Sequence, residues 1–391
     1  MHRRLLTNAV AGLALALTAA PAAAQETIVI GFGGGLTGYL AYYDGLTRNG
    51  AQLAVDEINA AGGIAGKYKI DFQVKDIRSE TPASATAGNE FAAAGVTALL
   101  APCDVDPAIA FSQAAQQAGI PVIAPCASTP TLVTAVGDFM FQTFAADNLQ
   151  AAVSAKFAQE QGYKTAYILL SPDTPYTEKL PLYFAEAFEK LGGKVLARGT
   201  YALGQQDFSA EVTNIKSLDP QPDVIMTSAY EPDFPAFIRQ LRAAGVTTPI
   251  LGSDGIDSPT TLALGDVAEG VIFTTAGFPT PGGSLEKLYA DYVAKFGGDA
   301  TTDTSPFLAT AYESVKLLAA AIEKAGSTDG TAIRDALWAI TDFEGATGSK
   351  ITFASTDRVA LRDVSLLRVE KGNKVLVTTL RPDPADVPKP H

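Results

Sequence analysis

Histidine is almost missing from this 391-residue sequence, which has only His2 and His391. His2 lies in a candidate leader segment and His391 is the last residue, so the body of the chain offers no imidazole. Ser-His-Asp or Cys-His catalysis, and metal chemistry through histidine ligands, are therefore excluded. An enzyme that uses carboxylates in a cleft remains as the alternative to a binding protein.

Cysteine is equally scarce, with Cys103 and Cys126 as the two in the chain. Each follows a predicted strand, Ala98–Ala101 or Ile120–Ala124. If these strands are neighbours in a parallel sheet, both cysteines emerge at the same end, which favours a disulfide in an oxidising compartment. The alternative is two unpaired, small apolar side chains. With no further cysteine and no histidine nearby, we expect no zinc or other metal site.

Long apolar runs are also lacking, since no later segment approaches the roughly 18 residues that span a bilayer. The N-terminal run Leu5–Leu17 is shorter, follows the basic residues Arg3 and Arg4, and precedes the small residues Ala22–Ala24. This order is typical of a secretory signal peptide. We expect residues 1–24 to be removed by cleavage near Ala24, and the remaining chain to be exported to the periplasm.

Positive charge is in deficit, because the whole chain carries a formal net charge of −13 and the leader removes two arginines. An acidic chain repels other polyanions. We therefore expect neither nucleic acid nor an anionic membrane surface as a partner.

The segment Gly33–Gly38 matches G-x-G-x-x-G, the pattern of dinucleotide-binding turns. In that motif the helix opens within the glycines, whereas here the predicted helix starts at about Tyr43, well after Gly38. We expect a glycine-rich loop that lets a ligand approach the backbone, and no nucleotide or other cofactor.

Predicted strands and helices alternate along the chain in steps of roughly 30 residues, which is typical of right-handed βαβ units on parallel sheets. One set ends near Thr143, and a second set runs from the helix Asn148–Gln161 to the strand Gly270–Thr275. The sequence thus predicts two doubly wound α/β domains. The late helices Leu285–Phe296 and Pro306–Ala325 have no strands of their own, so they must cover a sheet formed earlier, and the chain must cross back.

The stretch Leu99–Leu132 is the candidate binding floor. Its two strand ends stop at Pro-Cys pairs, and the helix Pro107–Ala118 between them is predicted to start with Asp106 as N-cap and Pro107 at the first position. Ligands bind at the carboxyl ends of parallel strands. Both loops are therefore expected to point Cys103, Asp104 and the polar residues after Cys126 at one place.

Several segments resemble the leucine/isoleucine/valine-binding family of periplasmic solute receptors for ABC importers. The strongest is Leu53–Gly66, LAVDEINAAGGIAG, followed by Gly119–Leu132, Asp207–Lys216, Gln240–Gly245 and Leu251–Gly255. The resemblance implies two Rossmann-like lobes joined by three crossovers, with hinges near Gln142–Ala145, Thr274–Gly277 and Ile351–Ala354. It places residues 25–144 and 277–353 in an N-terminal lobe, and residues 145–276 and 354–391 in a C-terminal lobe.

The resemblance also implies which residues bind the ligand in the cleft between the lobes. Ala127 and Ser128 match the pair that grips a ligand carboxylate, and Asp254 matches the acidic residue that accepts the ligand ammonium. The remaining matches are Cys126 and the cleft tyrosines Tyr43, Tyr176 and Tyr230. Turn formation before Pro130, or around Asp254, is the purely structural alternative for those positions.

Asp104 departs from the family pattern, which has serine or a similar residue there. An ionised carboxylate would repel a ligand carboxylate. Either Asp104 turns away and supports the helix start, or the ligand is rich in donors, such as an amide, a urea-like group or a cationic amino acid. Arg48 or Arg78 could offset its charge.

The predicted function is capture of an amino acid or small amide-like solute by hinge closure, with delivery to an ABC permease in the inner membrane. A monomer is expected. The alternatives are a receptor for aromatic or other small carboxylates, and a ligand sensor of the same fold.

Overall fold

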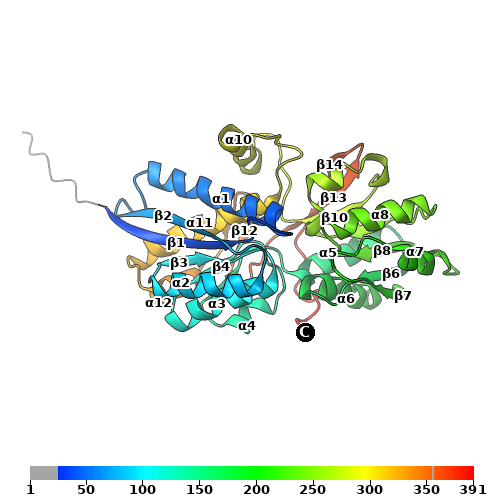
Figure 1. Ribbon diagram of the computed structural model, residues 1–391, viewed down its shortest axis with the longest axis horizontal. Coiled ribbons are helices and arrows are strands. Elements are labelled where there is room, and N and C mark those ends of the chain that lie inside the picture. The colour runs from blue at the N-terminus through cyan, green and yellow to red at the C-terminus, as the bar shows by residue number, and fades with distance from the viewer. Residues whose placement is uncertain (1–24, 355) are drawn as a thin grey trace, which may run out of the picture.

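The computed structural model describes residues 25–354 and 356–391, so the predicted signal peptide lies outside the described residues. Two α/β lobes lie side by side, each with a central sheet between helices (Figure 1). The predicted fold class is confirmed. Within the described ranges, no helix is both long and apolar enough to cross a bilayer.

The sheet of the first lobe has five parallel strands in the order β2-β1-β3-β4-β5. Their bounds are β1 Glu26–Gly34, β2 Tyr68–Asp76, β3 Ala98–Leu100, β4 Val122–Ala124 and β5 Met140–Gln142. The strand β1 continues into Gly33 and Gly34, and helix α1 begins only at Ala41. This gap between strand and helix is the reason that the glycine pattern does not form a dinucleotide turn.

Helices cover both faces of this sheet. One face packs against α1 Ala41–Ala60, α11 Pro306–Ala325 and α12 Gly330–Trp338, and the other against α2 Thr81–Ala93, α3 Val105–Ala118 and α4 Leu132–Val136. Helices α1 and α11 approach closely at Gly50, where a Cβ atom would lie 2.0 Å from the carbonyl oxygen of Leu308. The prediction that late helices cover an early sheet is therefore confirmed for α11, whereas the other late helix, α10 Ser284–Phe296, lies against α1.

The sheet of the second lobe has seven strands in the order β14-β13-β10-β9-β8-β6-β7. Five are parallel, and β13 and β14 add an antiparallel edge. Their bounds are β6 Thr165–Leu170, β7 Lys194–Thr200, β8 Val224–Thr227, β9 Ile250–Gly252, β10 Ile272–Thr275, β13 Val364–Glu370 and β14 Asn373–Leu380.

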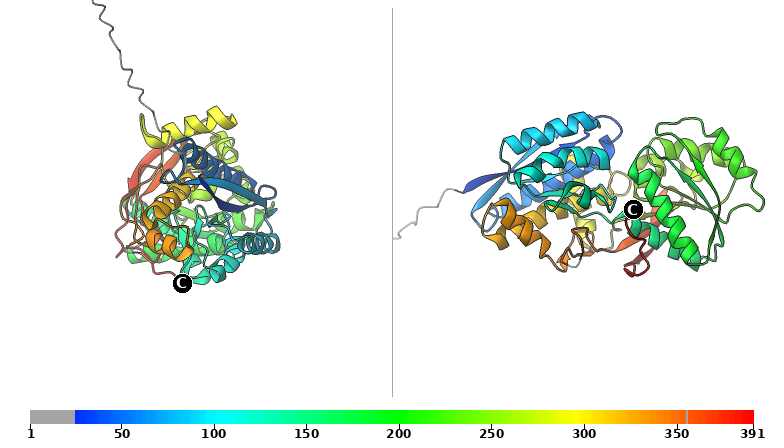
Figure 2. Two further views of the ribbon diagram at one scale, coloured as in Figure 1. Left: turned by 90° about the vertical axis from the view of Figure 1, so that its left-hand side faces the viewer. Right: turned by 90° about the horizontal axis from the view of Figure 1, so that it is seen from below.

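Helices α5 Asp147–Glu160 and α6 Pro175–Lys190 cover one face of this second sheet. The opposite face carries α7 Ser209–Lys216 and α8 Asp233–Ala243, with the short helix α9 Pro259–Leu262. Figure 2 shows the second lobe from below, with α6 in front of its sheet.

The chain passes between the lobes three times, after β5, after β10 and before β13. The first and third passages run together, because Gln142 pairs with Val359 and its backbone bonds to Arg358 and Ala360. After β10 the chain forms α10 Ser284–Phe296, which lies near α1, and α12 is followed by a small hairpin of β11 Phe343–Glu344 and β12 Lys350–Ile351.

The predicted start of α3 is wrong. The helix begins at Val105, two residues before Pro107, and its N-cap is Asp104, whose side chain accepts a hydrogen bond from the Val105 amide. Both aspartates satisfy the N-cap preference, so sequence alone does not choose between Asp104 and Asp106. The consequence is that Asp104, and not Asp106, lies at the junction of strand end and helix.

Candidate functional site

A cavity with about 430 Å³ of empty space, part of it open to solvent, lies between the lobes at the carboxyl ends of the strands of both sheets. We call it the inner cavity. It is lined by Leu40, Tyr43, Cys103, Asp104, Val105, Cys126, Ser128, Tyr176, Tyr230, Asp254, Gly255 and Phe307. Among the predicted ligand-binding residues, Ala127 is the exception: it is buried in the hydrophobic cluster that packs α2 and α3 onto the first sheet.

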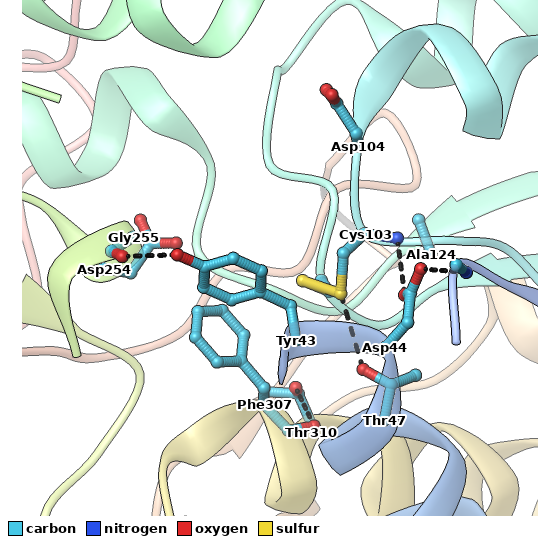
Figure 3. Close-up of a disulfide and its surroundings, with 12 residues drawn as sticks. Tyr43, Asp44, Thr47, Cys103, Asp104, Ala124, Asp254, Gly255, Phe307 and Thr310 are labelled. Carbon is cyan, nitrogen blue, oxygen red and sulfur yellow. Dashed lines mark hydrogen bonds between the residues drawn. A yellow bond between two sulfur atoms is a disulfide. The ribbon is translucent and has the colours of Figure 1, made fainter. Parts of the chain in front are cut away.

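The floor of the inner cavity is a disulfide between Cys103 and Cys126, whose Cα atoms are 4.7 Å apart. The predicted pairing is confirmed. Below it, the buried Asp44 accepts hydrogen bonds from the backbone amides of Cys103, at 2.9 Å, and Gly35, at 2.6 Å (Figure 3). Burial raises the pKa of Asp44 to about 7, although the two hydrogen bonds from the amides act to lower it. Asp44 thus fixes the glycine-rich loop to the cysteine loop, a role that sequence reasoning missed.

Asp104 lines the inner cavity and caps α3 at the same time. One carboxyl oxygen accepts the Val105 amide at 2.7 Å, and the other accepts the hydroxyl of Tyr39 at 2.7 Å. Burial raises the pKa of Asp104. Neither arginine considered from the sequence pairs with it, because Arg48 donates to Asn49 and Arg78 pairs with Glu80. A tyrosine hydroxyl, and not a cation, therefore faces this carboxyl group.

The second lobe contributes Asp254 with the hydroxyl network around it. Tyr176 donates to Asp254 at 3.3 Å, shares a 2.6 Å hydrogen bond with Ser253 and accepts the Gly255 amide at 2.9 Å. Burial raises the pKa of Asp254 to about 7. A bound ammonium group would favour the ionised form of this carboxyl.

Tyrosines connect the two walls of the inner cavity. The hydroxyl of Tyr43 donates to the carbonyl oxygen of Gly255 at 2.8 Å, and its ring meets Tyr230 and Phe307 edge to face (Figure 3). Tyr42 donates similarly to the carbonyl oxygen of Asp257. Gly255, the last residue of the family-like segment Leu251–Gly255, and Phe307, which no motif in the sequence indicated, complete this wall.

Ser128 lies in the loop after β4, where it contacts the first crossover. Its carbonyl oxygen accepts the side-chain amide of Gln142 at 3.1 Å and the backbone amide of Asp147 at 2.9 Å. The carboxyl group of Asp147 is fully buried beside the side chain of Ser128. Burial raises its pKa well above the usual range. The Ser128 loop is therefore coupled to the hinge.

No group of three or more histidine, cysteine or acidic side chains within residues 25–354 and 356–391 is arranged to hold a metal ion. The inner cavity lining contains tyrosines, two carboxyl groups and a serine, and no lysine, arginine or histidine. It can offer hydrogen-bond acceptors and aromatic faces to a small polar molecule.

Comparison with known proteins agrees with this geometry. The family model described as "Periplasmic binding protein" matches residues 27–374. The Leu/Ile/Val-binding protein BraC3 of Rhizobium johnstonii is 31% identical over 372 residues, covering 95% of this chain and 99% of its own.

Solved structures show the same fold. The substrate-binding protein LivJ of a branched-chain amino acid transporter from Streptococcus pneumoniae, in complex with isoleucine, superposes with a TM-score of 0.81 at 29% identity, covering 91% of this chain and 100% of its own. A solute-binding protein from R. palustris in complex with 4-hydroxybenzoate has a TM-score of 0.81 at 22% identity, covering 92% and 99%.

Proposed function

The chain belongs to the periplasmic binding protein family, and we propose that its ligand is an amino acid held in the inner cavity. As a member, it is an extracytoplasmic substrate-binding protein that serves an ABC transporter, and it is not an enzyme. The observation that carries the ligand proposal is the buried carboxyl group of Asp254, which has a hydroxyl donor but lines a cavity that contains no cationic side chain.

In the proposed complex, the ligand ammonium binds Asp254 and the ligand carboxylate binds at Ser128 and the adjacent Cys126–Ala127 backbone. Tyr43, Tyr176 and Tyr230 pack against the rest of the molecule. A buried carboxyl group is costly unless a charged donor pairs with it. An ammonium group meets that need. The relative BraC3 is named for binding leucine, isoleucine and valine, which supports an amino acid as the ligand of this chain.

Aromatic carboxylates are the second candidate, supported by the tyrosine-rich wall and by the hydroxybenzoate bound in a structural neighbour. Such ligands bring a carboxylate and no ammonium group. Since Asp104 and Asp254 both line the inner cavity, they would gain no ionic partner from such a ligand. We therefore favour the amino acid.

We further propose that the two lobes close over the ligand by rotation about the three crossovers. The first lobe comprises residues 25–144 and 277–353, and the second comprises residues 145–276 and 354–391. Each sheet lies within one of these sets, which supports the boundaries. We propose cleavage of a signal peptide near Ala24, a periplasmic monomer that does not bind nucleic acid, and delivery to an inner-membrane permease. Loss of uptake on deletion of the gene would separate transport from a sensory role.

The test is a thermal-shift and calorimetric screen with matched ligands on protein freed of ligand by unfolding and refolding. A true ligand at a hundred times its Kd should stabilise the protein by about 2.7 kcal/mol. We expect leucine, lysine or glutamine to bind, and the corresponding acids without the amino group to fail. Binding of hydroxybenzoate or hexanoate with no amino acid binding would contradict the role of Asp254.

A further inference from the structure

We propose that Lys374 and Asp257 form a latch between the lobes, which stabilises the closed form and so sets how long the ligand is retained. The latch consists of the buried Lys374–Asp257 pair and the two hydrogen bonds that connect this pair to the first lobe. Both residues lie outside the lining of the inner cavity, so they are positioning residues and not ligand contacts. This inference rests on the proposed function, because it assigns residues to the closure that the ligand requires.

Lys374 in β14 and Asp257 after β9 form an ion pair within the second lobe. The ammonium nitrogen lies 2.8 Å from one carboxyl oxygen, and the two side chains are 9% and 0% exposed. The other carboxyl oxygen accepts the hydroxyl of Thr275, at the end of β10, at 3.0 Å. Both carboxyl oxygens of Asp257 are therefore bonded inside its own lobe.

Two hydrogen bonds join this pair to the first lobe. The ammonium group of Lys374 also donates to the carbonyl oxygen of Thr304, a buried residue just before α11, at 2.8 Å. The hydroxyl of Tyr42 in α1 donates to the carbonyl oxygen of Asp257 at 3.1 Å. Because each bond joins the two lobes, their separation breaks both bonds and leaves the ion pair intact. The two bonds thus stabilise the closed form specifically.

The latch is built on chain segments that also line the inner cavity. Asp257 ends the short turn that begins at Asp254, and its amide donates to the carbonyl oxygen of Asp254 at 2.9 Å. Thr304 shortly precedes Phe307 in the chain, and both Asp254 and Phe307 line the inner cavity. The latch and a ligand in the inner cavity therefore hold the same segments of the two lobes together. Each should favour the other, because both stabilise one state.

Packing alone does not hold the lobes together beside the latch. A second cavity, with about 560 Å³ of empty space that is partly open to solvent, lies next to it and is lined by both lobes. Its lining includes Lys374 and Asp257 of the second lobe with Tyr289 and Pro306 of the first. Surfaces that are not closely packed lose dispersion contacts, so polar bonds must contribute more at this point. The bond from the ammonium group should be the stronger of the two, because its donor is charged.

The test compares Lys374→Met with Tyr42→Phe, since each removes one of the two bonds between the lobes. Lys374→Met should weaken binding at least about tenfold, and Tyr42→Phe about two- to tenfold, because only the first bond has a charged donor. Lys371→Met, at an exposed position of the same β-hairpin, is the control and should bind normally. The probe is leucine, lysine or glutamine, whichever raises the melting temperature of the wild type most, and calorimetry on the mature protein gives the Kd.

Lys374→Met also leaves the buried Asp257 without its cation, so a loss of stability must be separated from a loss of closure. Asp257→Asn/Lys374→Met contains neither charge and should resist urea better than Lys374→Met. It still lacks the bond to Thr304, so it should bind about as weakly as Lys374→Met. Stopped-flow kinetics should show faster ligand dissociation in both variants with little change in association, which a purely structural role would not produce.

A wild-type Kd and dissociation rate in the folded double variant would overturn the latch while leaving the proposed function intact. Weaker binding of Lys371→Met equal to that of Lys374→Met would also overturn it. If neither leucine, lysine nor glutamine binds the wild type, the proposed function fails, and 4-hydroxybenzoate replaces them as the probe of the latch.

Discussion

The hydroxyl of Tyr43 in α1 donates a 2.8 Å hydrogen bond to the carbonyl oxygen of Gly255, which follows β9 in the other lobe. Tyr43 also packs edge to face on Phe307 of the first lobe and Tyr230 of the second. One side chain of the first lobe therefore joins both walls of the inner cavity, through a backbone carbonyl oxygen and an aromatic ring of the second lobe.

Tyr43→Phe should loosen the closed form while keeping its aromatic packing. The variant loses the bond to Gly255 and the long 3.5 Å hydrogen bond that the hydroxyl accepts from the Glu231 amide. We expect a cost of about 0.5–1.5 kcal/mol, which corresponds to a two- to tenfold weaker ligand affinity. Calorimetry of both proteins with the tightest ligand of the screen measures this change in Kd. Tyr292→Phe, a tyrosine of α10 away from the inner cavity, is the control and should bind normally. An unchanged Kd for Tyr43→Phe would show that this bond contributes nothing to closure.

The Cys103–Cys126 disulfide should stabilise the first lobe. It joins residues 23 positions apart, and a closed loop of that size is worth about 3 kcal/mol in the chain-entropy treatment. Urea unfolding of the wild type with and without a phosphine reductant should reveal that loss. The Cys103→Ala/Cys126→Ala variant is the control: reductant should not change its stability. A wild type that resists unfolding equally well after verified reduction would contradict the prediction.

The fold was predictable where local signals and the global architecture agree. Helix α11 has the bounds predicted from sequence, because Pro306 opens it and Gly326, in the left-handed region at φ 60°, ends it. The parallel pairing of the strands in the first sheet also follows from the alternation of strands and helices.

The site was predictable only in part. Strand ends place Asp104 and Ser128 at one edge of the first sheet, and the family resemblance implied that Asp254 of the second lobe lies in the same cleft. The sequence could not reveal that Tyr39 bonds to Asp104, because that contact joins residues 65 positions apart and depends on side-chain direction. Asp147 and Arg362 were missed for a similar reason: a charged residue in a polar pattern resembles a solvated one until the fold buries it.

The buried pair Arg362–Glu313 should be a main support of the hinge. Its atoms lie 3.0 Å apart at 0% and 1% side-chain exposure. Arg362 also donates to the carbonyl oxygen of Thr143 in the first crossover, and Glu313 accepts the amide and hydroxyl of Thr347. Removing one member leaves the other charge buried and unpaired.

Glu313→Gln should therefore lower the free energy of unfolding by about 3–5 kcal/mol, measured by urea denaturation. Asp291→Asn, which breaks the exposed Lys287–Asp291 pair, should cost less than about 1 kcal/mol. The double variant Glu313→Leu/Arg362→Met should recover part of the loss, because it leaves no buried charge. A loss below 1 kcal/mol for Glu313→Gln would contradict this role.

Asp254 should make stability and ligand binding depend on pH in a defined direction. Burial raises its pKa to about 7 from the ordinary value of 3.8, so between these values the folded protein binds more protons than the unfolded chain. Stability then falls as pH rises through this window, and the contribution of this group levels off above about pH 7. Asp254→Asn should show a shallower fall in stability between pH 4 and 7 in ligand-free protein, measured by urea unfolding at each pH.

The same pH window applies to ligand binding, since an ammonium ligand favours the ionised carboxyl group. Affinity should rise with pH up to about 7, and the proton release should appear as a buffer-dependent heat of binding. Asp254→Asn should lose both the rise and the proton release. Equal pH slopes for wild type and variant would mean that Asp254 is already ionised in the free protein, and that its partner is something other than the ligand.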